Sequence, residues 1–566
     1  MSKTADLALF GGVVRTLDPA RPLAEAIAVS AGRIVAVGSQ ADIRAMCGPA
    51  TETIDLGGRL VLPGFQDAHV HPPMGGVEML RCDLTAGKSR HDYLEIVGAY
   101  AASHPDEEWI RGGGWHMPVF PGGLPLASDL DAVVGNRAVY LPNRDHHSGW
   151  ASSRALDLAG ISATTPDPPD GRIERDAAGS PTGALHEGAM TMVERLLPAL
   201  SKADFVEGLV AAQAYLHSLG ITAWQDAWVT THGADSAFEA YVDLDGAGRL
   251  TARVVGALWW ERDAGEEQVE ELLQRRADAS VCDHFRATSV KIMQDGVCET
   301  FTAAMLNPYL DSHGHETDNC GLSFVDPEAL KRYVTRLDSE GFQVHIHAIG
   351  DRAVREALDA VAAARSANGA SGLRHHLAHL QVVHPSDVGR FAPLDVVANF
   401  QPLWACADDQ MVELTIPYLG EVRAATQYPI GSIARLGGAL AFGSDWPVSS
   451  PDPLAEMEVA VTRCAPAGFR YASDAAGSLG AAGSSQPLLP AEAIDLGSAV
   501  RGFTSGSAFV NNLDDCTGTL EVGKFADLAV LDRDIFTTDA ADGGISGASV
   551  VMTMVGGLVV FEAPGS

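Results

Sequence analysis

Two pairs of histidines in the sequence are spaced i and i+2: His69 with His71, and His345 with His347. Side chains at this spacing point to the same side of a strand, so each pair can present two imidazoles to one metal ion. The competing interpretation of the first pair is two polar residues in a loop. In the second pair, His345 lies deeper in its strand, as a hydrogen-bonded core histidine would, and His347 is the better metal candidate.

Lys291 is unusual because the chain contains only six lysines and this one lies inside the apolar run Val290–Met293. Burying an ammonium without a partner is costly, so such a lysine is either paired or chemically changed. A neutral lysine amine can add CO₂ and become a carbamate, an anionic oxygen ligand that can bridge two cations. The alternative is an ion pair with Asp295 or another carboxylate.

Two further residues follow apolar runs later in the chain. His379 comes after Leu377 and Ala378, and its alternative role is that of a hydrogen-bonded interior imidazole. Asp445 comes shortly after Leu440–Phe442. A carboxylate at such a position can take a proton from a metal-bound water and pass it to a leaving group. Its alternative role is to cap the next helix.

Short apolar runs alternate with helical stretches through the middle of the chain. The predicted strands are Leu60–Leu62, Ala223–Trp224, Val254–Leu258, Val290–Met293, Gln343–Ile346, Leu377–Leu380, Val396–Phe400 and Leu440–Phe442. Helical stretches between them include Lys202–Ser218, Glu266–Ala279, Pro327–Glu340 and Arg352–Ala364, with Asp326 and Asp351 as helix starts. Eight strands joined by crossover helices predict an α/β fold, a closed (β/α)8 TIM barrel. The candidate residues then meet at the C-terminal face, where barrel active sites are built.

Both ends of the chain show short β-branched runs separated by glycine turns, as in Asp6–Val14 and Val550–Phe561. Neither end has enough strands to bury both faces alone, so residues 1–62 and 500–566 are predicted to form one composite β-sandwich. The barrel then spans residues 63–499. Within it, residues 72–199 are too long for one βα connection and are predicted to form an inserted lobe over the mouth. The Ala-, Gly- and Ser-rich segment Ser473–Pro487 is predicted to be a surface loop.

The motifs LPGFQDAHVH, VKIMQDG, HIHAIGDRAV and FGSDWPV together resemble the amidohydrolase superfamily of metal-dependent hydrolases. The chain looks most like the branch that contains N-substituted formamide deformylases, and the resemblance spans nearly its whole length. It implies one ion held by His69, His71, Asp445 and a carboxylated Lys291, and a second held by the same carbamate with His347 and His379. Relatives often have Glu before the strand-six histidine, where this chain has Ala378, so support for the ligands must come from elsewhere.

The reaction that this resemblance implies is hydrolysis of a C–N bond, an amide or N-formyl group, in a small organic substrate. Nitrogen and oxygen ligands without thiolate suit two zinc ions, although a single ion or another transition metal also fits. Metal coordination lowers the pKa of water toward about 7 and supplies hydroxide, with Asp445 as general acid and base. The same centre serves cyclic-amide hydrolysis, deamination or ester hydrolysis. Outside enzymes, a metal-free scaffold is the alternative, but it predicts missing ligands and here the set is complete.

Aromatic side chains and one histidine of the predicted mouth are expected to contact the substrate: Trp115, His147, Trp404 and Trp446. Such a wall suits an apolar or aromatic substituent. The alternative is that the bulky aromatic residues only pack the lobe.

The composition excludes several classes of protein. Of 566 residues, 46% are apolar, so the chain can bury a large core and is not disordered. With 73 acidic against 39 basic residues and a net charge of −34, binding to nucleic acid or an anionic membrane is not expected. The eight cysteines form no C-x-x-C pair, and no targeting or membrane-spanning segment is visible. We therefore expect a cytoplasmic homo-oligomer, a dimer, that acts on a small-molecule amide.

Overall fold

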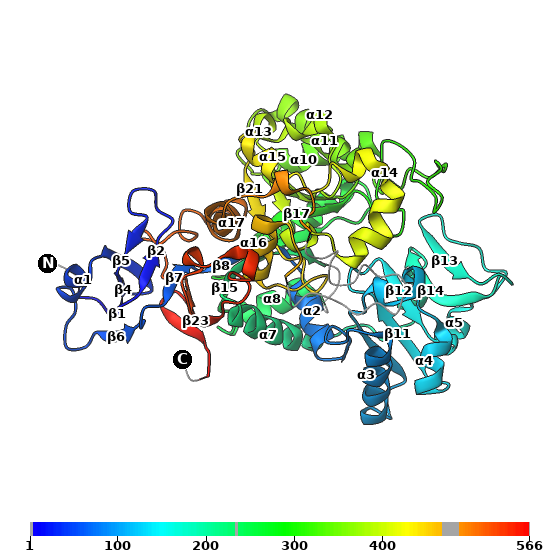
Figure 1. The fold of residues 1–566 in the computed structure, drawn as a ribbon, viewed down its shortest axis with the longest axis horizontal. Helices are drawn as coiled ribbons and strands as arrows, with labels where there is room; N and C mark the ends of the chain where they lie inside the picture. The colour runs from blue at the N-terminus through cyan, green and yellow to red at the C-terminus, as the bar shows by residue number, and fades with distance from the viewer. Residues whose placement is uncertain (1–3, 232–235, 467–485, 565–566) are drawn as a thin grey trace.

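The computed structural model describes residues 4–231, 236–466 and 486–564 (Figure 1). The predicted surface loop Ser473–Pro487 lies outside these ranges up to residue 485. Within the described ranges, no helix is both long enough and apolar enough to cross a membrane.

The centre of the molecule is a sheet of eight parallel strands that curves into a barrel. In spatial order the strands are β8 (Phe65–Val70), β15 (Ile221–Val229), β16 (Arg253–Trp259), β17 (Phe285–Met293), β18 (Gln343–Ala348), β19 (His376–His379), β20 (Val397–Phe400) and β21 (Leu440–Phe442). Crossover helices between them include α7 (Lys202–Ser218), α9 (Val269–Ala279), α10 (Pro327–Ser339) and α11 (Asp351–Asn368). This arrangement confirms the predicted (β/α)8 barrel. Asp326 caps α10, and α11 begins at Asp351, both as predicted, with Gly350 as the residue before α11.

The barrel closes at its mouth, where the first and last strands approach one another. The Asp445 N–H donates to the His69 carbonyl at 2.7 Å, and the His71 N–H donates to the Trp446 carbonyl at 2.8 Å. Gly443 makes this contact possible, because a Cβ at that position would lie 2.4 Å from the His69 backbone nitrogen. The closure therefore brings two segments, far apart in sequence, into direct contact at the place where the candidate residues lie.

The prediction that Leu60–Leu62 is the first barrel strand was wrong. These residues belong to β7 (Leu60–Pro63), which pairs with β2 (Val13–Arg15) and β22 (Leu528–Leu531) in an outer sheet. The barrel begins with β8 after Gly64, where a Cβ would lie 2.4 Å from the Thr222 side chain. The apolar pattern selected β7, because β8 is buried but carries the polar residues Gln66, Asp67 and His69. Apolarity reports burial in a hydrophobic core but not which sheet a strand joins.

Two outer sheets lie beside the barrel, one built from both ends of the chain and the other from the N-terminal end (Figure 1). The six-stranded sheet has the order β24 (Leu558–Glu562), β23 (Val550–Val555), β22, β7, β2, β3 (Leu23–Ala24). The four-stranded sheet has the order β5 (Arg33–Gly38), β4 (Ala26–Ser30), β1 (Leu7–Phe10), β6 (Glu52–Asp55). One apolar cluster, including Leu9, Ile27, Leu528 and Met554, joins the two sheets. The boundaries 1–62 and 500–566 themselves stay a prediction.

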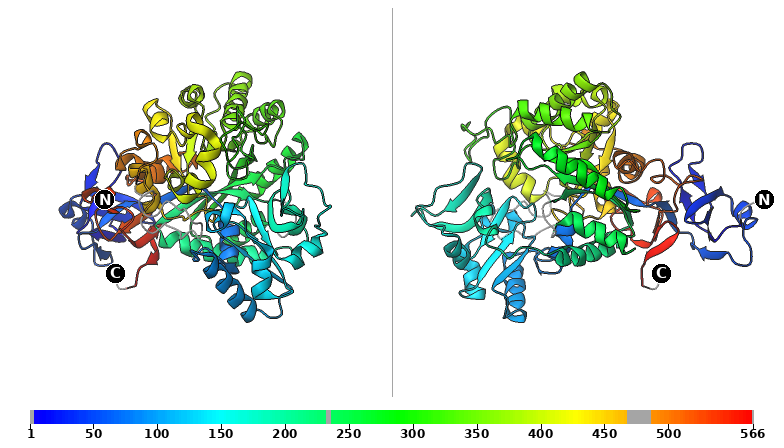
Figure 2. Two further views of the ribbon diagram at one scale, coloured as in Figure 1. Left: turned by 45° about the vertical axis from the view of Figure 1, so that its right-hand side comes forward. Right: turned by 180° about the vertical axis from the view of Figure 1, so that it is seen from behind.

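The segment predicted to be an inserted lobe has a sheet of its own, on the side of the barrel away from the outer sheets (Figure 2). Its six strands have the order β13 (Gly171–Arg175), β14 (Pro181–Glu187), β12 (Ser148–Ala151), β11 (Ala138–Pro142), β10 (Trp109–Gly113), β9 (Cys82–Asp83). Helix α3 (Arg90–Ser103) packs on this sheet through Tyr93 and Val97. The lobe thus has a core independent of the barrel, and it contributes His147 and Glu187 to the cavity at the barrel mouth.

Candidate metal centre

All six residues proposed as metal ligands line one cavity of about 420 Å³ at the barrel mouth. They lie at the C-terminal ends of five barrel strands or just beyond them: His69 and His71 at β8, Lys291 in β17, His347 in β18, His379 at the end of β19, and Asp445 after β21. Each is almost completely buried. We call these six residues the mouth cluster.

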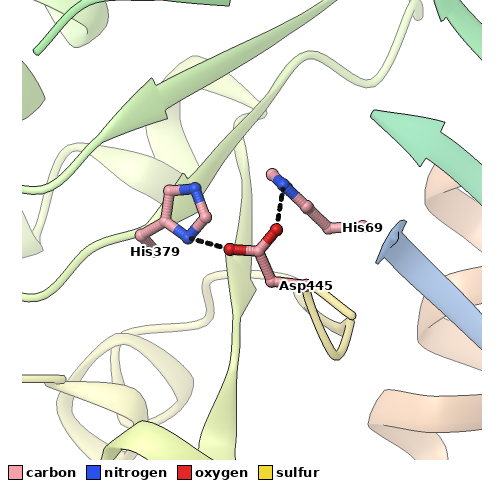
Figure 3. Close-up of side chains that lie close together, drawn as sticks. All are labelled: His69, His379 and Asp445. Carbon is pink, nitrogen blue, oxygen red and sulfur yellow. Dashed lines mark ion pairs between the residues drawn. The ribbon is translucent and has the colours of Figure 1, made fainter. Parts of the chain in front are cut away.

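Asp445 lies at the centre of the mouth cluster. Its Oδ1 is 2.8 Å from His71 Nε2. The same Oδ1 is 3.1 Å from His69 Nε2, and Oδ2 is 3.9 Å from His379 Nδ1 (Figure 3). Burial raises the pKa of this carboxyl, but the neighbouring histidines outweigh burial and hold the pKa well below its ordinary value. Asp445 is therefore a carboxylate at neutral pH, surrounded by imidazole nitrogens.

Lys291 approaches the cluster from β17, with Nζ 3.3 Å from His69 Nε2. Burial lowers the pKa of its ammonium to about 8, against the opposing influence of Asp445 and Asp226. About a tenth of the amine is therefore neutral at pH 7, in the form that reacts with CO₂, far more than for a lysine of ordinary pKa. The alternative partner Asp295 is otherwise engaged, because it accepts hydrogen bonds from the backbone N–H groups of Ala304, Ile349 and Gly350.

His347 and His379 form the other side of the cluster, with ring centroids 4.4 Å apart. Burial lowers the pKa of both well below the ordinary value, so both rings are neutral. The His379 ring stacks on Trp404 at 5.3 Å with an interplanar angle of 5°. His379 and Asp445 both have left-handed backbone conformations, with φ of 79° and 56°. Strained non-glycine residues of this kind gather at functional sites.

The residues of the mouth cluster fit a divalent cation. Nitrogen and oxygen donors without thiolate are the set that zinc and other transition metals accept. The buried Nδ1 atoms of His71 and His379 have no hydrogen-bond partner among the described residues. Ligand atoms of His69, His379 and Asp445 all lie within 4.8 Å of one another. That these residues bind metal stays a prediction, but their chemistry and burial agree with it.

Of the side chains expected to contact substrate, His147 and Trp404 line the cavity. His147 Nδ1 is 2.9 Å from Glu187 Oε1. Burial lowers the pKa of His147, but Glu187 outweighs it and raises the value to about 9. His147 is therefore cationic at neutral pH and can donate to a substrate oxygen.

Trp115 and Trp446 lie elsewhere. Trp115 is fully buried in the lobe core, where its Nε1 donates to the Leu141 carbonyl and its ring packs on Phe120. Trp446 packs against Tyr215, with ring centroids 5.6 Å apart. Neither indole is among the side chains that line the cavity, and a role for them in the substrate wall stays a prediction.

Other aromatic residues take their place. Trp228 and Trp259, whose ring centroids lie 5.0 Å apart, line the cavity together with Phe324. Neither Trp228 nor Trp259 was among the residues predicted to contact the substrate. Their positions could have indicated this role, because Trp228 and Trp259 lie at the C-terminal ends of two barrel strands, where active-site residues concentrate.

The fold and the mouth cluster define a (β/α)8 barrel with a candidate centre for a divalent cation at its C-terminal face. The family model described as "Amidohydrolase family" matches residues 52–561. The chain therefore belongs to the amidohydrolase family. This membership confirms the resemblance inferred from the motifs and the predicted enzyme class, a hydrolase acting on C–N bonds other than peptide bonds.

Individual relatives extend over the same length. The chain is 31% identical to Protein LONG AFTER FAR-RED 3 of Arabidopsis thaliana, covering 98% of this chain and 91% of the relative. It is 29% identical to the N-substituted formamide deformylase of Arthrobacter pascens, covering 100% of both. Among solved structures, an uncharacterised metal-dependent hydrolase from Pyrococcus furiosus superposes with a TM-score of 0.69 at 26% identity, covering 93% of this chain and 99% of that one.

Proposed function

We propose that the protein is a divalent-metal hydrolase that cleaves the C–N bond of an amide or N-formyl group in a small organic substrate. The observation that carries the proposal is the position of Asp445, a buried carboxylate within 3.1 Å of two histidine nitrogens in a cavity large enough for a small molecule. The deformylase among the relatives supports an N-formyl or related amide as the substrate class.

Two zinc ions are proposed as the cofactor. His69, His71 and Asp445 would hold one, His347 and His379 the other, and a carboxylated Lys291 would bridge them. When bound, such ions lower the pKa of a coordinated water and polarise the carbonyl that it attacks. The protein contributes a fixed and water-poor arrangement of donors, because every member of the cluster is almost completely buried.

Asp445 would carry the proton during the reaction. As a carboxylate it can accept the proton that the attacking water loses when its oxygen bonds to the substrate carbonyl carbon. As the C–N bond breaks, the same carboxyl donates that proton to the departing nitrogen. Its pKa, held low by the histidines, makes the carboxylate the resting form, so the cycle begins and ends with Asp445 deprotonated.

The cavity walls would set specificity. Cationic His147, held by Glu187, is suited to donate to an oxygen of the substrate. Trp228, Trp259 and Trp404 offer flat apolar surfaces for an aryl or alkyl substituent. We propose further that the enzyme works as a cytoplasmic homodimer. Its eight free cysteines suit a reducing compartment.

Metal analysis combined with a substrate panel tests this proposal. The purified full chain, reconstituted with zinc and bicarbonate, is assayed against N-formyl amines, N-acyl amino acids, lactams, ring amidines and esters. We expect two metal ions per chain and the highest kcat/KM on an N-formyl or simple amide substrate. Hydrolysis confined to lactams, amidines or esters would replace the proposed substrate class. Absence of both metal and hydrolysis would overturn the proposal altogether.

A further inference from the structure

Beneath the mouth cluster, the barrel interior is filled by buried polar side chains instead of aliphatic ones. We call this set the polar layer: Gln225 in β15, Gln343 and His345 in β18, His376 in β19 and Asn399 in β20. All five are at most 2% exposed. Barrel interiors are usually packed with Val, Ile and Leu, and buried polar groups are tolerated only when hydrogen bonded. The hydrogen bonds within this layer therefore show which ring nitrogen of each histidine carries a proton.

Gln343 fixes one end of the layer. Its Nε2 donates to the carbonyl oxygens of Arg374 at 2.9 Å and Val510 at 2.7 Å. Backbone carbonyls only accept, so the amide orientation of Gln343 is determined. Its Oε1 then accepts from Gln225 Nε2 at 3.1 Å. Consequently the Gln225 Oε1 faces the opposite side, where His345 Nδ1 lies at 2.8 Å and must donate to it.

Asn399 gives the same orientation by an independent route. Its Nδ2 donates to the Ala68 carbonyl at 2.9 Å and to His376 Nδ1 at 3.1 Å. His376 therefore carries its proton on Nε2, which lies 2.9 Å from Gln225 Oε1. From this side too, the Gln225 Oε1 is an acceptor.

The orientation of Gln225 determines the proton position on His69. With its proton on Nδ1, His345 has a lone pair on Nε2, which lies 2.8 Å from His69 Nδ1 and accepts from it. Among the described residues His345 contacts no carboxylate, so a doubly protonated ring at this fully buried position would be costly. His69 thus has no proton on Nε2, which faces Asp445 Oδ1 at 3.1 Å and Lys291 Nζ at 3.3 Å. Two lone pairs that face each other are stabilised by a cation placed between them.

We infer that Gln225 and His345 are positioning residues that hold the His69 proton on Nδ1 and so keep Nε2 available to a metal ion. This role rests on the metal dependence of the proposed function. It differs from the role of a ligand, because neither residue lines the cavity. The ring nitrogen of a metal-bound histidine that does not face the ion is ordinarily fixed by such a partner, and its loss weakens metal binding about 10–100-fold.

The test uses Co²⁺ as the probe on the full-length, metal-free protein, with binding measured by chelator competition and by visible absorption. His345→Leu removes the acceptor for His69 Nδ1 and should weaken cobalt binding about 10–100-fold. His345→Gln can place an amide oxygen near the former Nε2 and should restore binding. His376→Leu is the matched control, because it removes a histidine of the same layer that also bonds Gln225 but does not touch His69. It should bind cobalt like the unchanged protein.

Several results would overturn the inference. Unchanged cobalt binding in His345→Leu would show that His69 needs no partner. Equal weakening in His376→Leu would show that packing of the layer matters instead of proton position, and failure of His345→Gln to restore binding would count the same way. If the unchanged protein takes up no cobalt, the proposed function fails instead.

A measurement on the unchanged sequence keeps the inference testable if the leucine variant does not fold. Nitrogen NMR of the metal-free protein, labelled at histidine, reports which ring nitrogen carries the proton, and His69→Gln identifies the signal. We expect a proton on Nδ1 of His69 and none on Nε2. A proton on Nε2 of His69 would refute the inference that Gln225 and His345 hold the proton on Nδ1.

Discussion

The mouth cluster and the polar layer are both built from buried histidines, but they differ in how the ring nitrogens are paired. In the polar layer, His376 has partners on both nitrogens, Gln225 and Asn399, and His345 likewise bonds Gln225 and His69. In the mouth cluster, Nδ1 of His71 and Nδ1 of His379 have no hydrogen-bond partner in the described part of the chain. Both sets of histidines are buried, but only the mouth cluster contains ring nitrogens without a hydrogen-bond partner among the described residues.

This difference indicates that the polar layer supports the barrel structure, whereas the mouth cluster is where we propose that the metal binds and the reaction takes place. Buried polar groups are normally paired, so the satisfied layer needs nothing further to be stable, whereas the mouth cluster needs a ligand. A change in the mouth cluster should therefore alter metal binding and turnover more than stability. Changes far from the mouth should do the reverse.

The largest expected effect is that of Asp445→Asn. The amide keeps an oxygen that can bind metal but cannot accept and return a proton, so we expect kcat to fall about 1,000-fold while metal remains bound. Turnover and metal content are measured on the same preparation. Asp263→Asn is the matched control, because this exposed residue lines the cavity entrance without contacting the cluster, and it should retain full activity. Undiminished kcat in Asp445→Asn would remove Asp445 from the mechanism.

Lys291→Ala should have the next largest effect. Without the amine no carbamate can form, so we expect metal content to fall from two ions to one and the affinity of the remaining ion to fall about 10–100-fold. Elemental analysis and chelator competition measure both quantities. Lys331→Ala, on the solvent side of α10, provides the control and should change neither. Two tightly bound ions in Lys291→Ala would exclude a bridging carbamate.

Much of the fold follows from the sequence, because seven predicted strands overlap seven of the eight barrel strands. The first strand was misplaced because β7 is wholly apolar, whereas β8 carries the buried polar residues Gln66, Asp67 and His69 and shows no apolar run. The pairing of β7 also depends on contacts with Leu528–Leu531, nearly 470 positions later. Local pattern carries no information about a partner that distant in the chain.

The candidate site was predictable to a similar extent. Histidine spacing and position after strands placed the mouth cluster, because strand ends of a barrel converge on one face. Gln225, whose amide orients the layer, could not be predicted, because its role depends on proton positions set by Arg374 and Val510 carbonyls on other segments. Trp115 packs in the lobe core and does not line the cavity. The sequence left both roles open, because an indole fills a core as readily as a cavity wall.

At the rim of the mouth, the His147–Glu187 pair predicts a specific pH dependence of stability. The pKa of His147 is raised from its ordinary 6.5 to about 9 in the folded protein. The stability contributed by this pair is therefore fully present below pH 6.5 and is lost as the pH rises through 9. Glu187→Gln should reduce the unfolding free energy by on the order of 2 kcal/mol at pH 6, and by progressively less toward pH 9.5. Urea denaturation across this range measures the difference between the two proteins, and a difference independent of pH would show that His147 is neutral.

The smallest expected effect is that of replacing Asp326, an aspartate like Asp445 that lies outside the mouth cluster. The carboxylate of Asp326 accepts from the backbone N–H groups of Glu328 and Ala329 at the start of α10. Because these are helix-capping bonds, Asp326→Ala should lower the unfolding free energy by about 1 kcal/mol. Metal content and kcat/KM should remain unchanged, since the cap has no contact with the mouth cluster. If Asp326→Ala reduced kcat/KM as strongly as Asp445→Asn, the activity losses at the mouth would have to be attributed to weakened folding. The proposed difference between hydrogen-bonded structural residues and the metal-binding mouth cluster would then fail.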